Sequence, residues 1–161
     1  MGGSEYYEHI HNLTGGQVSR VNLKKEKLLL RSLLRILRSG RVESAHDISK
    51  GGLAAALAEM SVQGRKGVTI DLDRVPDKTS RMDNLLFSES RSRFVLETKP
   101  KNSARIVSSF KRLGILTARV GTVTDNGIEF LSNGQPIITI PLAEASRAWS
   151  ETIPRAMEAT L

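Results

Sequence analysis

Cysteine is absent from the 161-residue chain, so disulfide bonds and thiolate-held zinc are both excluded. The same absence fits a reducing compartment, and we expect a cytoplasmic protein. Aromatic residues make up only 4% of the chain, which is too few for the stacked side chains that hold single-stranded nucleic acid. No apolar run approaches the ~20 residues that span a bilayer, and the polar N-terminus carries no secretory signal. We therefore expect neither a nucleic-acid partner nor a membrane.

The composition that is present belongs to an ordinary globular protein. Hydrophobic residues make up 39% and charged residues 25% of the chain, and the length suits one domain or at most two small ones. Lys and Arg outnumber Asp and Glu by 24 to 17, which gives a net charge of +7. Such an excess is typical of proteins that meet an anionic ligand, an acidic surface or nucleic acid, although solubility alone can explain it.

A strongly amphipathic segment, residues 23–39, predicts the first long helix. One face of it gathers leucines at helical spacing: Leu30, Leu33, Leu34 and Leu37. A second stripe is basic: Lys24, Lys27, Arg31, Arg35 and Arg38. A solvated face or a partner surface explains this stripe more simply than nucleic-acid binding, because no aromatic residues interleave with the cations.

Further helices and strands follow, and together they predict an α+β fold. Helices are expected after Ser49 as N-cap, over residues 102–114 and at the C-terminal end. Strands are expected near residues 41–46, 67–72, 94–96, 115–124, 128–132 and 136–142, with residues 125–127 as a hairpin turn. Residues 93–123 form a predicted strand-helix-strand unit whose sheet the hairpin extends. We expect a mixed, mainly antiparallel sheet with packed helices.

The beginning of the chain has a different character. Residues 1–22 contain two Gly-Gly pairs and no periodicity, so we expect irregular structure there. A start of this kind is typical of the middle of a longer chain. The predicted organisation is therefore a linker over residues 1–22, from a preceding domain that is absent, and one domain over residues 23–161.

The first candidate site is the polar stretch that leads into the second helix, "DISKGG". A helix N-terminus offers free N–H groups and partial positive charge, which suit phosphate, and Gly51 and Gly52 would let the backbone approach an anion. Asp47 could hold a Mg²⁺ ion that bridges phosphate oxygens. The ordinary alternative is a capped helix whose glycines allow close packing, and the pattern alone favours this alternative.

The second candidate site is "SESRSR", residues 88–93, just before a strand. Glu89 and Ser90 stand there beside Arg91 and Arg93, and arginine binds phosphate with two parallel hydrogen bonds. A solvated turn before a strand is the ordinary alternative. The histidines at positions 9, 11 and 46 have no further ligand at a convincing spacing, so we do not predict a histidine metal site.

Two quoted motifs resemble a known family. "SAHDISKGGLAAALAEM", followed about thirty residues later by "LLFSESRSRFVLE", resembles the last domain of phosphoribosylformylglycinamidine synthase, in the aminoimidazole ribonucleotide synthase superfamily. "GGSEYY" is similar to the segment that precedes this domain in the family, and the closing strands and helix with Trp149 are similar to its C-terminal end. The resemblance covers essentially the whole chain.

This resemblance implies a function and a set of partners. The family enzyme is an ATP-dependent C–N ligase of purine biosynthesis that uses Mg²⁺, glutamine-derived ammonia and ATP to amidate formylglycinamide ribonucleotide. It has two pseudo-symmetric halves, and the chain resembles the C-terminal-type domain of the second half. The implied partners are the N-terminal-type domains of the same enzyme, its glutaminase and its small accessory subunits. Alone, the chain is expected to be inactive, with no catalytic residue of its own.

The resemblance also assigns binding residues around an auxiliary nucleotide cleft. Pseudo-symmetry implies that ATP and Mg²⁺ would meet seven residues, with Asp47 as the metal ligand: Asp47, Ser49, Gly51, Gly52, Glu89, Ser90 and Arg91. The chain departs from the family pattern twice, with Lys50 where Asp is common and Arg91 where the first half has Gln. Both changes add positive charge, which suits an anion.

Two other functions remain as alternatives. One is a stand-alone binding or scaffolding module whose basic helix docks an acidic partner or nucleic acid. The other is a related superfamily member in hydrogenase maturation or selenophosphate synthesis. A different motif at the helix start is expected for that member.

Overall fold

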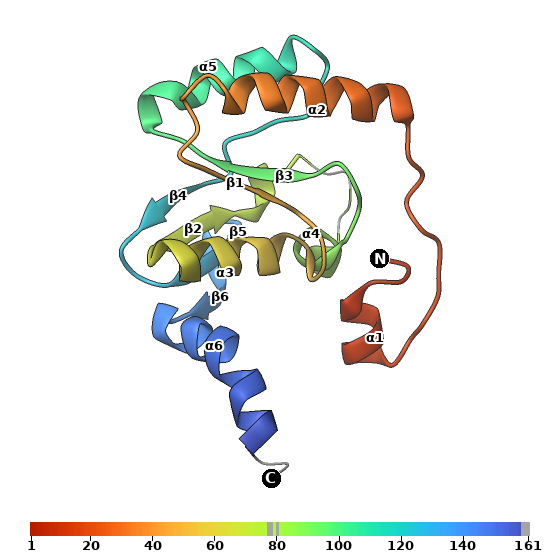
Figure 1. Ribbon diagram of the computed structural model, residues 1–161, viewed down its shortest axis with the longest axis vertical. Helices are drawn as coiled ribbons and strands as arrows, with labels where there is room; N and C mark the ends of the chain where they lie inside the picture. The colour runs from red at the N-terminus through yellow and green to blue at the C-terminus, as the bar shows by residue number, and fades with distance from the viewer. Residues whose placement is uncertain (77–78, 80, 159–161) are drawn as a thin grey trace. The chain divides into compact units, whose positions relative to one another are not determined.

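Helices and strands alternate irregularly along the chain (Figure 1). The computed structural model describes residues 1–76, 79 and 81–158. The elements are α1 (Glu5–His11), α2 (Leu23–Leu37), β1 (Ser44–Asp47), α3 (Gly52–Gly64), β2 (Gly67–Asp71), the 3₁₀ helix η1 (Leu72–Arg74), α4 (Met82–Phe87), β3 (Phe94–Glu97), α5 (Pro100–Lys111), β4 (Gly121–Thr124), β5 (Ile128–Ser132), β6 (Gln135–Ile140) and α6 (Leu142–Glu158).

The chain forms two compact units, which are described separately. The first comprises Met1–Ala56 and Val75–Arg119, and the second comprises Leu57–Arg74 and Val120–Leu161. Helix α3 begins in the first unit and ends in the second. The predicted boundary between residues 22 and 23 is a different division of the chain, and it stays a prediction.

The first unit is built on a two-stranded ribbon in which β1 pairs antiparallel with β3. Helices α2 and α5 pack together through Leu33, Ile106 and Phe110, which form a buried apolar cluster. Phe94 and Leu96 from β3 pack against the same cluster, so the two helices lie on the ribbon. Burial of each such side chain contributes about 1.5–3 kcal/mol, which holds this layer together without disulfides.

The four leucines that the sequence places on one face of α2 differ in burial. Leu33 is buried, whereas Leu30, Leu34 and Leu37 are exposed, because the buried side of α2 is centred near Ile36. Residues 1–22 are not irregular throughout, since Glu5–His11 is helical. The Ser4 hydroxyl caps this helix by accepting a hydrogen bond from the Tyr7 N–H at 3.3 Å.

The second unit contains a four-stranded sheet in the order β4-β2-β5-β6. Strand β2 pairs parallel with β5, and the other two pairs are antiparallel. Alternate residues of the central strands are buried, as in Ile128 and Phe130 of β5 and Val68 and Ile70 of β2. The predicted α+β class with a mixed, mainly antiparallel sheet is confirmed.

The predicted sheet continuity and the first hairpin are wrong. Strand β3 does not share a sheet with β4, and β2 lies between β4 and β5, so residues 125–127 connect strands that do not pair. The connection crosses the start of β2 at Gly67, where an added Cβ would lie 2.4 Å from the Gly127 carbonyl oxygen. The real hairpin joins β5 to β6, where Asn133 and Gly134 have φ of 50° and 72°.

No helix among the described residues combines the length and the apolar character that crossing a bilayer requires.

Candidate functional site

The start of α3 explains the two glycines of the first motif. Gly51 and Gly52 have φ of 71° and 69°, the left-handed region that favours glycine, so they form the turn by which the chain enters the helix. The Gly52 N–H donates to the Ser49 carbonyl oxygen at 3.1 Å within that turn. Because α3 begins at Gly52, Gly51 occupies the position before it. The predicted cap at Ser49 is therefore wrong.

Gly52 also meets a neighbouring helix at very short range. A Cβ added there would lie 2.6 Å from the Leu86 carbonyl oxygen and 2.7 Å from the Phe87 Cα, both at the end of α4. Real Cβ atoms do not approach backbone atoms that closely. Gly52 is therefore required by packing inside the first unit, which was the ordinary alternative for this motif.

Glu89 joins the two candidate motifs. Its Oε1 atom accepts a hydrogen bond from the Gly51 N–H at 3.0 Å and another from the Glu5 N–H at 3.0 Å. These N–H groups stand at the starts of α3 and α1, where helices leave donors unpaired and concentrate partial positive charge. A carboxylate of the chain thus holds two helix starts, separated by 46 positions in the sequence, against the loop after α4.

An ion pair lies at the same place, the junction where Glu89 meets the starts of α1 and α3. The Lys50 Nζ lies 2.6 Å from Glu5 Oε1, and His9 Nε2 lies 2.9 Å from Glu5 Oε2. The pKa of the Glu5 carboxyl is lowered below its usual range, mainly by the hydrogen bond from Lys50 and to a smaller extent by the one from His9. The hydrogen bond to Glu5 likewise raises the pKa of Lys50. Since the Lys50 side chain is 82% exposed and the Glu5 side chain 32% exposed, solvent screens the pair, which positions α1 more than it stabilises the fold.

A hollow of about 390 Å³ lies beside this junction. Three of the predicted site residues line it, and the other walls come from the N-terminal segment. The lining residues are Met1, Gly2, Gly3, Ser4, Val18, Ser19, Val21, Glu89, Ser90 and Arg91. The second motif therefore faces a hollow, whereas Asp47, Ser49 and Gly52 do not line it.

Some polar groups of the second motif already form hydrogen bonds within the chain. The Ser90 hydroxyl lies 2.8 Å from the Ser88 hydroxyl, and the Arg93 guanidinium donates to the Ser88 carbonyl oxygen at 3.0 Å. The Arg91 side chain is exposed and makes no ion pair within the described part of the chain. Arg91 is therefore the cation of this motif that is available to an anion in the hollow.

Asp47 ends β1 and points to solvent, with 65% of its side chain exposed. Its Oδ1 atom lies 3.9 Å from the His46 Nδ1. No group of three or more potential metal-ligating side chains occurs among residues 1–76, 79 and 81–158. Asp47 could therefore supply one ligand to Mg²⁺, and any others would come from phosphate or water oxygens or from another polypeptide segment.

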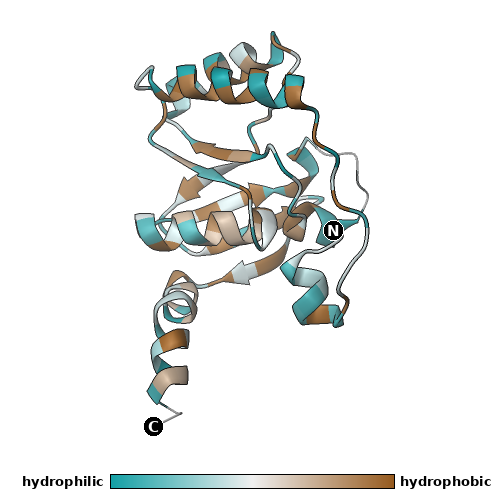
Figure 2. Cartoon of the chain, turned by 45° about the vertical axis from the view of Figure 1, so that its right-hand side comes forward, coloured by the Kyte–Doolittle hydropathy of each residue, from teal (hydrophilic) through white to brown (hydrophobic). Residues whose placement is uncertain are grey.

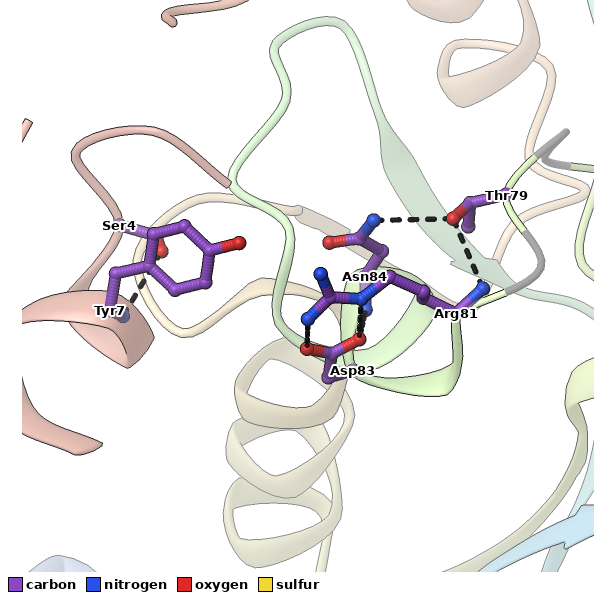
Figure 3. Close-up of polar contacts among 6 residues, drawn as sticks. All are labelled: Ser4, Tyr7, Thr79, Arg81, Asp83 and Asn84. Atoms are coloured by element: carbon purple, nitrogen blue, oxygen red, sulfur yellow. Dashed lines mark hydrogen bonds and ion pairs between the residues drawn. The ribbon is translucent and has the colours of Figure 1, made fainter. Parts of the chain in front are cut away.

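Sequence reasoning missed a polar cluster between α1 and the start of α4 (Figure 3). The Arg81 Nε donates to Asp83 Oδ1 at 3.0 Å, and the Tyr7 ring points toward the Arg81 and Asn84 side chains. The pKa of Arg81 is raised mainly by Asp83 and to a smaller extent by Tyr7. The hydrogen bond from Arg81 in turn lowers the pKa of Asp83. The cluster fastens α1 to α4.

An aromatic contact fastens the same two helices. The Tyr6 ring stacks on the Phe87 ring with centroids 4.6 Å apart and planes within 2°. The neighbouring tyrosines of "GGSEYY" were a usable signal, because adjacent aromatics in a true linker would have no surface to pack against. The expected linker over residues 1–22 stays a prediction, and it did not anticipate this contact.

Comparison with known proteins identifies the family. The family described as AIR synthase related protein, C-terminal domain, matches residues 1–132. The phosphoribosylformylglycinamidine synthase subunit PurL of Methanocaldococcus jannaschii is 34% identical over 157 residues, which is 98% of this chain and 21% of that protein. The chain therefore spans about a fifth of the length of the curated relatives it matches.

Solved structures agree with the sequence comparison. Thermotoga maritima PurL complexed with ATP superimposes with a TM-score of 0.70 at 25% identity, covering 74% of this chain and 21% of that one. The structure of PurLQS from Thermotoga maritima gives a TM-score of 0.71 at 25% identity, covering 89% of this chain and 25% of that one. The resemblance inferred from the two motifs is confirmed.

Proposed function

Because the chain belongs to the family of AIR synthase related C-terminal domains, we propose that it takes part in the ATP-dependent amidation of formylglycinamide ribonucleotide in purine biosynthesis. In this proposal it is the C-terminal domain of a phosphoribosylformylglycinamidine synthase subunit. Its relatives carry that name, and the Thermotoga maritima neighbours were solved with ATP and with FGAR.

One observation carries the local part of the proposal. The Gly51 N–H and the Glu89 carboxylate meet at 3.0 Å, so both motifs belong to one junction, and the second motif faces the adjacent hollow. An anion in the hollow would meet the exposed Arg91 guanidinium and the Ser90 side chain. Two acceptors on a phosphate group match the two-pronged geometry of arginine.

The residues fit a magnesium nucleotide only in part. The first-turn N–H groups of Leu53 and Ala54 have no hydrogen-bond partner within the described residues, so they remain as donors near the helix start. Asp47 would hold Mg²⁺, which would supply charge neutralisation at phosphate. The Gly51 N–H, in contrast, is already occupied by Glu89. We propose nucleotide binding at Glu89, Ser90 and Arg91 in the hollow and at Asp47, Ser49 and Gly52 beside the helix start, with Gly51 acting through Glu89.

The length of the chain, about a fifth of that of the PurL proteins it matches, indicates that it needs partners. Amidation by this route requires reactants to be held in a water-excluding cleft, and a chain one-fifth as long as PurL provides only part of one. We propose that the N-terminal-type domains of the enzyme complete the cleft and that glutaminase and small accessory subunits deliver ammonia. The isolated chain is then catalytically inert.

A chimera tests this proposal. The matching segment of the Methanocaldococcus jannaschii subunit would be replaced by this chain, and turnover would be measured with ATP, formylglycinamide ribonucleotide and ammonium ions. We expect turnover by the chimera and none by the isolated chain. The chain would not serve this reaction if a folded chimera were inactive, and turnover by the isolated chain would contradict its dependence on other domains.

Nucleotide binding needs a separate measurement on the same chimera. Calorimetric titration with Mg·ADP should show binding that weakens at least about tenfold in Arg91→Ala, because a charge-assisted pair is lost. Asp47→Ala should weaken binding only when Mg²⁺ is present. Arg119→Ala, also exposed, is the matched control and should bind as the parent does. Equal effects of Arg91→Ala and Arg119→Ala would remove Arg91 from the site.

A further inference from the structure

Charge is distributed unequally between the two units. The first unit contains 19 Lys and Arg residues against 9 Asp and Glu, whereas the second contains 5 against 8. The net charge of +7 therefore arises from a unit at +10 and a unit at −3. The excess is concentrated in the two outer helices of the first unit, α2 and α5, which alternate between hydrophilic and hydrophobic residues (Figure 2).

Helix α2 has three distinct faces, because successive residues turn by about 100° around its axis. The buried face contains Leu33 and Ile36, which pack on α5 and the ribbon. A second face, the leucine row, is exposed: Leu23, Leu30, Leu34 and Leu37. A third face beside the leucine row, the cation row, is basic: Lys24, Lys27, Arg31, Arg35 and Arg38.

Nothing in the described part of the chain covers the leucine row. Leu23 is 77% exposed, Leu30 is 45% exposed and Leu34 is 46% exposed. Scattered apolar residues on a surface need no explanation, but these leucines recur at intervals of seven, four and three positions along one side of a helix. Aligned in this way, they form a continuous apolar strip of the kind that a second amphipathic helix covers.

The side chains of the cation row are also exposed to solvent. None of its five members forms an ion pair with a side chain in the described part of the chain. The acidic residue of α2, Glu26, lies on the far side of the leucine row and accepts a hydrogen bond from Ser92. Since α5 packs against α2 and adds exposed Lys101, Arg105 and Lys111, the positive field extends across both helices.

We propose that the leucine row and the cation row of α2 together form a docking surface for an acidic amphipathic helix of a separate protein chain. The apolar strip of the partner covers the leucine row, and its Glu and Asp side chains meet the cation row. Charge complementarity of this kind speeds the encounter of separate molecules and fixes their register. A covalently linked neighbour would gain little from such steering, so we assign the surface to a separate chain.

Nucleic acid fits this surface less well. A phosphate backbone would pair with the cation row, but it would leave the adjacent leucine row without an apolar surface to contact. Helix α2 has no aromatic residue to stack on bases, and Phe110 of α5 is buried. A second copy of the chain also fits less well, because the acidic residues of its exposed helix α6 lie opposite the apolar face that contains Trp149 and Ile153.

A designed peptide tests the surface on the intact chain. The probe is a fluorescein-labelled amphipathic helix of about 20 residues, about 30 Å long, with a leucine strip flanked on one side by glutamates. Binding would be followed by fluorescence anisotropy. We expect it to bind at least about tenfold more tightly than the same peptide with lysines in place of glutamates, with affinity falling as salt is raised.

Variants locate the binding site. Leu34→Glu and Arg31→Glu should each weaken the acidic peptide at least about tenfold, whereas Leu116→Glu and Arg119→Glu, exposed elsewhere in the same unit, should stay within about twofold. Circular dichroism checks that each variant folds. If Leu34→Glu does not fold, Arg31→Glu and Arg119→Glu decide the question.

Three outcomes would overturn the proposal. The first is equal binding of the acidic peptide by the parent chain and by Arg31→Glu, or no binding at all. The second is tighter binding of labelled duplex DNA than of the peptide. The third is self-association of the chain in sedimentation experiments that Leu34→Glu abolishes, which would assign the surface to a second copy.

Discussion

The Oε1 atom of Glu89 accepts a hydrogen bond from the backbone N–H of Gly51 at 3.0 Å. The two residues are 38 positions apart, and each comes from a different polar motif of the sequence. Their contact makes the two motifs one structural junction, which also receives the Glu5 N–H at the start of α1. The predictions below test this junction and the packing on either side of it.

Glu89→Ala should release both helix starts together. The Glu5 and Gly51 N–H groups would lose a charged acceptor, which costs about 1.5–3 kcal/mol for a hydrogen bond of this type. Amide hydrogen exchange measured by NMR should therefore speed up at both positions in the variant. Glu89→Gln, which keeps an acceptor oxygen of the same reach, should retain part of the protection. Faster exchange at one position alone would show that the two bonds are independent.

Gly52→Ala should be strongly destabilising for two reasons that add. The residue has φ of 69°, and its new Cβ would lie 2.6 Å from the Leu86 carbonyl oxygen. We expect a loss of about 2–4 kcal/mol in the free energy of unfolding, measured by urea denaturation.

Gly114→Ala is the matched control for Gly52→Ala. Its φ is 70°, but nothing lies within 4 Å of its Cβ position. It should lose only about 1 kcal/mol, from the backbone strain alone. If the two variants lost equal stability, the close approach of Gly52 to α4 would have no energetic effect.

Stability should fall on acidification, because two carboxylates have lowered pKa values. Lys50 lowers the pKa of Glu5, and Arg81 lowers the pKa of Asp83. A carboxyl whose folded pKa lies below its unfolded value stabilises the fold above the unfolded pKa, and this contribution disappears as pH falls through the folded pKa. The thermal midpoint should therefore be level above about pH 5 and decline below about pH 4.

Variants separate this effect from general acid denaturation. The double variant Glu5→Gln and Asp83→Asn should show a shallower decline, because the groups that titrate have been removed. Glu144→Gln, at an exposed position of α6, should leave the decline unchanged. An identical decline in all three proteins would exclude Glu5 and Asp83 as its source.

Gly67→Ala should destabilise the second unit. The new Cβ would lie 2.4 Å from the Gly127 carbonyl oxygen and 2.8 Å from the Asn126 carbonyl carbon, where the chain crosses β2. We expect a loss of about 1–3 kcal/mol in the free energy of unfolding. Gly64→Ala, at the end of α3 with open space around its Cβ position, should change stability by less than about 1 kcal/mol. Similar losses in both variants would contradict the crossing as the cause.

Local chemistry allowed many elements to be predicted from sequence. The strands expected over residues 67–72 and 128–132 and the helix expected over residues 102–114 are set by neighbouring residues, and the structure contains them as β2, β5 and α5. The partners of these elements were not predictable in the same way. Residues 125–127 have hairpin chemistry, yet they join β4 to β5 across β2, since strand order depends on contacts distant in sequence.

The candidate site likewise combines features that the sequence determined with features that only the tertiary structure decided. The sequence by itself determined the polar motifs, their positive charge and the family to which the chain belongs, because these depend only on which residues occur and at what spacing. Only the tertiary structure decided that Glu89 would occupy the Gly51 N–H, that Gly52 would press against Leu86, and that Leu34 would face outward. Each of these depends on the direction of a side chain or helix face, which is fixed by packing between segments that lie far apart in the chain.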